Sequence, residues 1–303
     1  MKILVHIIRC LIGLTFIYSG ISKLYPIEPF ELFIFDQNIF GLTVSAILAR
    51  LIIGTEILLG IILIINIYSK NSIRISFFLL VVFTLFLSYL VIFKSEITNC
   101  NCFGDHLAFT PLESIFKNLI LIGLIVILLL KNISFKIPYK ILIVSILIAG
   151  SFSLPFILNP PDRFVINFRQ EETGYQFDYE KLGELSYKGN NYNFKDEKAV
   201  ICFYSMTCKY CKLTAQKIAI TLKNNKLNPN IFYIFLGEES DLDQFWEEGK
   251  SPVIQYKILP PDQFFALSGL SLPSIYFIDN GVVVKKVGYR NLFESDFVEF
   301  FEK

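Results

Sequence analysis

The sequence predicts a membrane bundle of α-helices followed by an α/β domain. Its 303 residues are 53% hydrophobic and only 18% charged, whereas about a quarter of an ordinary soluble domain is charged. The charges are unevenly spread: of the 28 Lys/Arg and 27 Asp/Glu residues, 11 and 7 lie in residues 1–160. Two kinds of sequence are therefore joined end to end, an apolar half and a half with the charge content of a soluble protein.

Composition also excludes several classes of protein. The net charge of +1 and the lack of a basic tract exclude a general nucleic-acid-binding protein, because phosphate contacts need clustered Lys and Arg. The 31 Phe and 15 Tyr residues exclude a disordered chain. Six cysteines are too few for a disulfide scaffold of this length, so their spacing is more informative than their number.

Five stretches are apolar enough to cross a bilayer, which takes roughly 20 residues. They cover residues 3–24, 41–67, 73–93, 112–130 and 141–158. The first is expected to be a retained helix rather than a signal peptide, since Arg9 interrupts it and no small-residue cleavage site follows. We therefore predict a four-helix transmembrane domain in residues 1–131, a fifth helix and linker in 132–161, and a separate domain in 162–303.

Lys and Arg residues in the short loops predict the orientation of the spans. With a cytoplasmic N-terminus, the inner segments hold six of them, whereas the outer loops, 25–40 and 94–111, hold Lys94 alone. This topology places the loop after span three, and all residues beyond 159, on the periplasmic side of a bacterial inner membrane. Disulfides persist in that compartment.

Charged side chains inside the spans need partners, since each costs roughly 2.5–3.5 kcal/mol on insertion scales. Arg9 and Glu56 differ in depth by about two helical turns, at ~1.5 Å per residue. We therefore expect an ion pair between Arg9 and Glu56. Arg50 has no obvious acidic partner, and one interpretation has it facing a polar cavity near the outer cysteine loop.

Pro160 and Pro161 end the last span, and strands then alternate with helices. The expected strands are 199–204, 230–236, 274–279 and 282–287, the last two joined by an Asn-Gly turn. The expected helices are 212–223, 241–248, 261–268 and 291–302.

A C-x-x-C motif, Cys208 to Cys211, lies between the first of these strands and its helix. The helix N-terminus stabilises a thiolate on Cys208, and Lys209 adds positive charge. Cys211, one turn further on, can resolve a mixed disulfide. Half a zinc site looks similar, but this half of the chain has no second C-x-x-C and no histidine, so we predict no bound metal.

Residues 199–212 resemble the active-site strand and helix of the thioredoxin-like superfamily, and residues 270–281 resemble its later cis-proline segment. The resemblance, which covers roughly residues 164–303, implies a cis bond between Leu272 and Pro273 and a backbone edge there that holds substrate. Cys202 stands where thioredoxins carry a buried acidic residue. We expect Cys202 to be an inert core residue, since free cysteine packs as a small hydrophobe.

Residues 9–24 are similar to the first helix of the DoxX/MauE membrane family, and Arg50, Glu56 and Gly60 resemble its second helix. Residues 100–104, Cys-Asn-Cys-Phe-Gly, resemble the C-x-C-F-G loop of the MauE branch. The resemblance covers about residues 1–130 and implies a four-helix bundle, with the fifth span carrying the outer domain. MauE is associated with maturation of methylamine dehydrogenase, a disulfide-rich periplasmic enzyme.

The C-x-C motif places the sulfurs of Cys100 and Cys102 close enough to form a small ring, which favours a redox-active pair. Two alternatives stay open: unpaired loop thiols, and a metal site completed by His106 or Asp105. Cys10 lies deep in the first span and is expected to be a packing residue.

Together these features predict a membrane-anchored thiol–disulfide oxidoreductase acting on extracytoplasmic protein cysteines. Cys208 and Cys211 would exchange electrons with Cys100 and Cys102, in a layout analogous to fusions of vitamin K epoxide reductase-like proteins with thioredoxin domains. The alternative is a non-catalytic assembly factor of the MauE type, with structural cysteines. A membrane quinone is the candidate cofactor, although the sequence reveals no pocket for it and leaves the direction of electron flow open.

Overall fold

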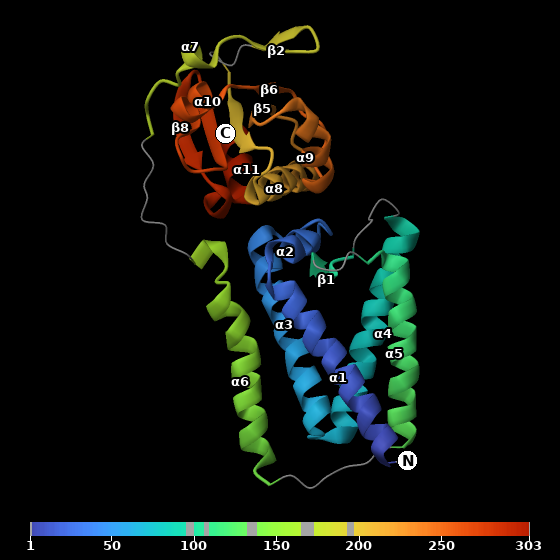
Figure 1. The fold of residues 1–303 in the computed structure, drawn as a ribbon. Helices are drawn as coiled ribbons and strands as arrows, with labels where there is room; N and C mark the ends of the chain where they lie inside the picture. The colour runs from blue at the N-terminus through green and yellow to red at the C-terminus, as the bar shows by residue number, and fades with distance from the viewer. Residues whose placement is uncertain are drawn as a thin grey trace. The chain divides into compact units, whose positions relative to one another are not determined.

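A computed structural model describes residues 2–94, 100–105, 109–131, 138–164, 173–192 and 197–302. The chain divides into two compact units, Met1–Pro161 and Asp162–Lys303. Figure 1 traces both units, coloured by residue number from the N-terminus to the C-terminus.

The first unit consists almost entirely of helices (Figure 1). They are α1 (Lys2–Leu24), α2 (Glu28–Phe35), α3 (Leu42–Ile65), α4 (Ser69–Phe93), α5 (Pro111–Leu130) and α6 (Lys140–Leu158), with the short strand β1 (Cys102–Asp105) between α4 and α5. All except α2 are long and apolar enough to cross a membrane, so the protein is a multi-pass membrane protein.

Helix α2 lies in a segment that was predicted to be an outer loop, residues 25–40. It has acidic residues and a proline in its first turn, Glu28, Pro29 and Glu31, which are favourable at a helix N-terminus. The helix also buries Phe30 and Phe33 against the bundle. Its eight residues are too few to stand out as a hydropathy signal.

Close backbone contacts hold the bundle together. A Cβ atom added to Gly13 of α1 would come within 2.7 Å of the Gly60 carbonyl of α3, so these two helices cross where both residues are glycine. Gly54, also on α3, lies in the same way against Ser151 and Phe152 of α6. Helix α5 begins at a capping box in which Thr110 and Glu113 satisfy each other's backbone amides.

The predicted ion pair between Arg9 and Glu56 is wrong. Arg9 donates hydrogen bonds to Asn66, which caps the C-terminus of α3, and to Ser69, the first residue of α4. Glu56, in the middle of α3, pairs with Lys23 instead, at 2.7 Å. The register of α1 on α3 explains the difference, because Asn66 lies ten residues, or roughly 15 Å, beyond Glu56.

Arg50 also has a partner that sequence reasoning did not find. Its guanidinium pairs with Glu31 of α2 at 2.6 Å and donates to the Asn159 carbonyl at the end of α6. The interpretation in which Arg50 faces a polar cavity is therefore replaced by an anchor that joins α2, α3 and α6. The sequence concealed it because Glu31 was assigned to a loop.

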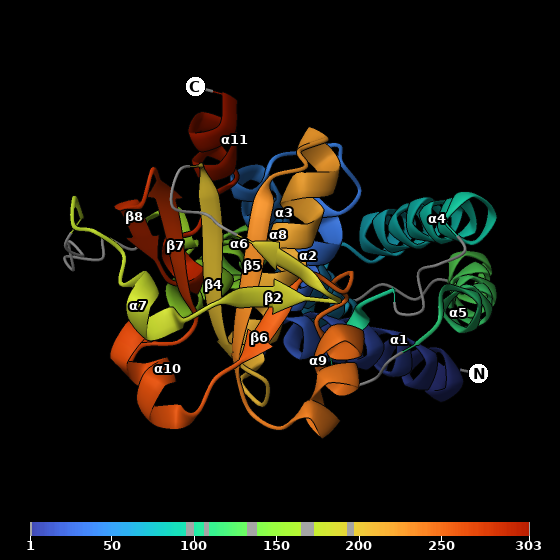
Figure 2. The same cartoon turned by 90° about the horizontal axis from the view of Figure 1, so that it is seen from above.

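The second unit is an α/β domain (Figures 1 and 2). Its strands are β2 (Leu185–Tyr187), β3 (Asn190–Tyr192), β4 (Ala199–Ser205), β5 (Asn230–Leu236), β6 (Tyr256–Ile258), β7 (Ser274–Asp279) and β8 (Val282–Val287). Its α-helices are α7 (Tyr179–Leu182), α8 (Lys209–Asn225), α9 (Leu242–Glu248), α10 (Pro261–Ser268) and α11 (Glu294–Glu302), and short 3₁₀ turns cover Asp162–Phe164, Glu239–Asp241 and Tyr289–Asn291.

The main sheet has five strands in the order β6-β5-β4-β7-β8. Strand β4 lies at its centre, parallel to β5 and antiparallel to β7, and Asn280 and Gly281 make the predicted turn between β7 and β8. A separate hairpin consists of β2 and β3. The predicted fold class, a helical membrane bundle followed by an α/β thioredoxin-like domain, is confirmed.

Two apolar layers enclose the main sheet. Alternate residues of β4 point to opposite faces: Cys202 and Tyr204 pack with α8, α9 and α11, whereas Ile201 and Phe203 pack with α7 and α10. Because both faces are covered, β4 is apolar along almost its whole length, and its carboxyl end places the next residues at the start of α8.

Candidate functional site: two cysteine pairs

Cys208 is the N-cap residue of α8, directly after the strand β4 and a short turn. Its backbone is extended, and its carbonyl accepts from the amides of Cys211 and Lys212. Its side chain is half-buried, while those of Lys209 and Tyr210 beside it are exposed. The sulfur is thus reachable from solvent at the positive end of a helix of 17 residues.

These surroundings lower the pKa of Cys208 to about 6. The largest cause is the thiol of Cys211, which donates a hydrogen bond to the Cys208 sulfur. The backbone amides of Cys211 and Tyr210 and the charge of Lys212 lower it further, and burial opposes them. A thiolate at neutral pH follows from this arrangement.

Cys211 has the opposite character. It is buried in the apolar cluster between the sheet and α8, and burial raises the pKa of its thiol. Cys202 lies in the same cluster, and burial raises its pKa to about 12. One thiol of the C-x-x-C is therefore an ionised nucleophile and the other a protonated hydrogen-bond donor, while Cys202 has the environment expected of a core residue.

The proline segment before β7 lies against the same cluster. The peptide bond between Leu272 and Pro273 is cis, as the resemblance to the thioredoxin-like superfamily implies. Leu272 is half-buried and packs on the cluster that contains Cys211 and Cys208, and Pro273 is buried. The role of Pro273 in holding substrate stays a prediction.

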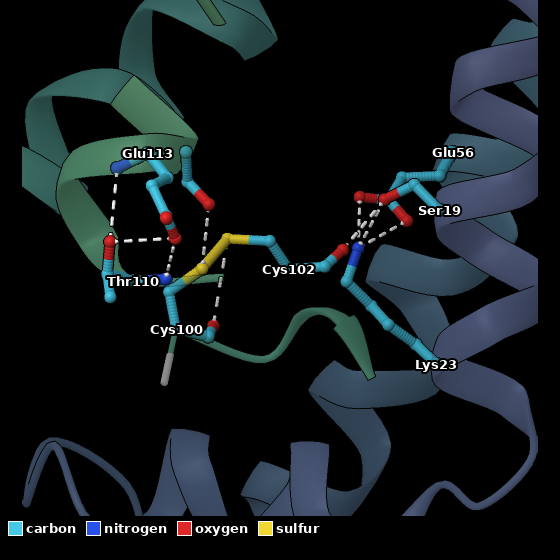
Figure 3. Close-up of a disulfide and its surroundings, with 8 residues drawn as sticks. Ser19, Lys23, Glu56, Cys100, Cys102, Thr110 and Glu113 are labelled. Carbon is cyan, nitrogen blue, oxygen red and sulfur yellow. Dashed lines mark hydrogen bonds and ion pairs between the residues drawn. A yellow bond between two sulfur atoms is a disulfide. The ribbon is translucent and has the colours of Figure 1, made fainter. Parts of the chain in front are cut away.

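Cys100 and Cys102 form a disulfide at β1, with their Cα atoms 5.3 Å apart (Figure 3). The alternative of two unpaired loop thiols is therefore wrong. Both residues are buried in an apolar cluster with α1, α2, α3 and α4, and Cys100 Sγ lies 3.0 Å from the Ser114 hydroxyl of α5. The alternative metal site remains a prediction, since His106 and the side chain of Asp105 lie outside the described residues.

Glycine allows β1 to dock on the bundle. Gly104 has φ of +61°, and a Cβ atom there would lie 2.2 Å from the Ser22 carbonyl of α1. Asn101, between the two cysteines, donates to the Pro29 carbonyl of α2 at 3.2 Å. The disulfide is thereby fixed to α1 on one side and to α2 on the other.

A short polar chain connects this disulfide to the buried ion pair (Figure 3). The Ser19 hydroxyl donates to the Cys102 carbonyl at 3.0 Å, and Lys23 donates to Ser19 at 2.7 Å and to both carboxylate oxygens of Glu56. On the other side, the Lys117 ammonium lies 4.2 Å from the ring centre of Phe103. Sequence reasoning missed Lys23 and Lys117 as site residues, because their partners depend on how the helices pack.

Cys10 in α1 is a half-buried free thiol. It lies on the other side of the close contact at Gly13, away from the loop that carries Cys100 and Cys102. Its predicted role in packing stays a prediction.

Comparisons with known proteins divide the chain in the same way. Residues 1–131 match the family model of methylamine utilisation protein MauE. Protein TlpB of Flavobacterium psychrophilum is 29% identical, over 92% of this chain and 90% of its own length.

Two solved structures cover 44% of this chain. They are a solution structure of a thiol:disulfide interchange protein from Bacteroides sp. (20% identity, 91% of that chain, TM-score 0.34) and a crystal structure of the thioredoxin domain of a thiol-disulfide oxidoreductase from Bacteroides vulgatus (21% identity, all of that chain, TM-score 0.33). The chain joins a membrane domain that matches the MauE family model to an α/β domain with a five-stranded central sheet.

Proposed function

We propose that this protein is a membrane-anchored thiol–disulfide oxidoreductase that acts on protein cysteines. The observation that carries the proposal is the pairing at the start of α8, where a thiolate-stabilising site at Cys208 adjoins a protonated thiol at Cys211. A buried structural cysteine has a raised pKa instead, as Cys202 has.

The chemistry follows from this difference in pKa. The Cys208 thiolate attacks a disulfide of the client protein, one client sulfur leaves, and a mixed disulfide joins Cys208 to the client. Cys211 then attacks the Cys208 sulfur, its proton passes to the departing client thiolate, and a Cys208–Cys211 disulfide remains. The reverse sequence oxidises a client dithiol, and the low pKa of Cys208 makes it a good leaving group in that direction.

Cys100 and Cys102 form the second half of the proposed system. A pair in the membrane unit can exchange with Cys208 through a mixed disulfide, and the tether between the units supplies an effective concentration in the mM range. Both sulfurs are buried, so this exchange requires β1 to move away from α1.

Orientation is the remaining part of the proposal. The distribution of Lys and Arg supports an extracytoplasmic position for the loop between α4 and α5 and for the α/β domain. A membrane-impermeant maleimide should label Cys208 in intact, reduced cells. Labelling that requires permeabilisation would contradict this topology.

Alkylation trapping tests the proposal in cells. Acid quenching followed by alkylation should find Cys208 and Cys211 in both oxidised and reduced forms, with a ratio that shifts when client synthesis is blocked. Cys202 serves as the control and should stay reduced. A permanently oxidised Cys208–Cys211 pair would instead favour a non-catalytic assembly factor, the second candidate, which the match to the MauE model supports.

A further inference from the structure

A cavity of about 370 Å³ lies inside the membrane unit, between α1, α2, α3, α4 and α5. This volume lies within the range of small-molecule sites, roughly 300–1,000 Å³. Most of its lining is apolar, and six phenylalanines contribute to its wall, among them Phe30, Phe33, Phe83 and Phe86. Phe33 meets Phe86 edge to face, with ring centres 6.3 Å apart.

Asn118 is the observation that points to a ligand. This residue of α5 lines the cavity and is fully buried, yet among the described residues neither its amide nitrogen nor its carbonyl oxygen has a hydrogen-bond partner. An unsatisfied buried amide costs about 1–3 kcal/mol, so such a group is normally paired. A ligand carrying both acceptor and donor capacity would satisfy it.

A second polar group lies beside this amide. Lys117 also lines the cavity, and its ammonium stacks on the ring of Phe103. The ion pair of Lys23 and Glu56 lines the cavity as well. The site thus combines an apolar, aromatic interior with hydrogen-bond donors from two adjacent residues of α5.

The cavity adjoins the membrane disulfide. Phe30 and Phe33 belong to the same apolar cluster as Cys100 and Cys102, and Phe83 and Phe86 pack against that cluster. Ser19, another lining residue, donates to the Cys102 carbonyl. A ligand in the cavity therefore touches side chains that themselves contact the C-x-C pair.

We propose that this cavity binds a membrane quinone, and that the quinone oxidises the reduced Cys100/Cys102 pair. A flat conjugated ring with two carbonyl oxygens and an apolar tail matches the phenylalanine wall and the membrane location. The Asn118 amide donates to a quinone carbonyl and accepts from a quinol hydroxyl, so it suits both redox forms. A lipid acyl chain would leave the amide unsatisfied.

The proposed step balances in atoms and electrons. Two S–H bonds, at Cys100 and Cys102, are broken and one S–S bond forms. The two electrons and two protons pass to the two carbonyl oxygens, so quinone becomes quinol. The quinone proposal deepens the proposed function and rests on it for one point only, the direction of electron flow. Electrons would pass from client thiols through Cys208 to Cys100 and Cys102.

The test uses the full-length protein in lipid nanodiscs with decylubiquinone as the probe. The quinone should raise the Tm of the parent protein. Fully reduced parent protein should convert one quinone to quinol at the Cys100/Cys102 pair, and a second quinone when Cys208 and Cys211 pass their electrons on to that pair. Asn118→Leu, a change of similar shape, should weaken quinone binding about tenfold through the lost hydrogen bond. It should not lower the Tm without quinone, because the amide is unsatisfied there.

Ser76→Ala is the matched control. Ser76 on α4 is also fully buried with an unpaired hydroxyl among the described residues, but it does not line the cavity. It should leave quinone binding unchanged. A photoreactive azidoquinone on the parent protein provides a readout without any variant, and it should label α4 or α5 rather than α6.

Two results would overturn the inference: equal stabilisation of parent and Asn118→Leu by decylubiquinone, or no quinol formed by reduced parent protein. Exchange at Cys208 with a soluble disulfide is measured separately. If that exchange persists while the quinone reaction fails, the quinone site is wrong and the oxidoreductase stands. If Cys208 is inert while quinol forms, the proposed function fails instead.

Discussion

Cys208 is half-exposed at the N-terminus of a helix, with Cys211 buried one turn further on, whereas Cys100 and Cys102 are both enclosed among membrane helices. Backbone amides, a neighbouring thiol and a nearby lysine stabilise the Cys208 thiolate. Around the second pair, close contacts of β1 with α1 and α2 keep water and large partners away. One pair is thus suited to protein clients, and the other to a partner that enters through the bundle or after β1 moves.

This difference shows how one chemical group acquires two roles. Sulfur reactivity depends on ionisation and on access. The helix end supplies both to Cys208, while burial withholds access from Cys100 and Cys102 until the local structure opens. A substitution that changes one of these conditions should therefore alter one pair more than the other.

Removing the resolving cysteine tests whether the two pairs communicate, and it should have the largest effect. In Cys211→Ser, the mixed disulfide on Cys208 cannot be resolved, so we expect it to accumulate as an internal link to Cys100 or Cys102. Proteolysis without reductant, followed by mass spectrometry, would identify the cross-linked peptide. As the control, Cys202→Ser added to the Cys211→Ser variant should leave the link unchanged. Adducts found only on other proteins would exclude a relay within one chain.

Breaking the buried ion pair beside the disulfide should have the next largest effect. Lys23→Met leaves Glu56 as an unpaired buried charge and should destabilise the membrane unit by about 3–5 kcal/mol. The double variant Lys23→Met/Glu56→Leu should recover most of that loss, and Arg74→Met at an exposed position should change little. Unfolding in detergent measures all three, and equal losses in the single and double variants would contradict this account.

The sequence predicts much of the fold, because hydropathy and turn chemistry are local signals. The apolar runs located five spans, and the Asn280-Gly281 turn located the hairpin of β7 and β8. Short elements were missed: β6 has only three residues, and α2 lies between two membrane spans in a segment assigned to an outer loop.

The site was predicted less completely, because partners depend on how helices cross. Cys208 and Cys211 were evident from their spacing, and their opposite environments depend only on a helix end and a buried face. The partner of Glu56 depends on the contact of α1 with α3, which no local pattern encodes. Asn118 in the fourth span likewise gave no signal until the fold placed it on a cavity.

Loosening β1 should expose the membrane disulfide. Gly104→Ala places a Cβ atom against the Ser22 carbonyl. It also requires alanine to adopt the left-handed backbone conformation of Gly104, which costs about 1–2 kcal/mol. Reduction of the Cys100–Cys102 disulfide by dithiothreitol should become about tenfold faster, because the free energy needed to detach β1 from α1 falls by the same ~1–2 kcal/mol. Gly123→Ala on α5, where a Cβ meets nothing within 4 Å, is the matched control. An unchanged rate would show that β1 does not limit access.

The pH profile of Cys208 tests the other pair. With a pKa of about 6, the rate of alkylation by iodoacetamide should fall about tenfold between pH 7 and pH 5. The pKa of Cys208 in the folded protein lies below its unfolded value of about 8.5. Ionisation of Cys208 therefore stabilises the reduced protein fully at a pH above about 8.5, and this stabilisation is lost as the pH falls through about 6. A midpoint near 8.5 would contradict the site geometry.

The smallest expected effect is on the pKa of Cys208, and it distinguishes the contributions of Lys212 and Lys209. Lys212 lowers the pKa of Cys208 but also pairs with Glu248 at 2.7 Å, so part of its charge is already balanced. Lys212→Gln should therefore raise the Cys208 pKa by only about 0.2–0.7 units, from the 0.2–1 kcal/mol typical of exposed charges. Lys209→Gln removes the residue that the sequence singled out, and its exposed side chain should give a shift no larger. Alkylation rates across pH measure the Cys208 pKa in both variants. A larger pKa shift in Lys209→Gln than in Lys212→Gln would show that Lys209 is the main lysine that stabilises the Cys208 thiolate.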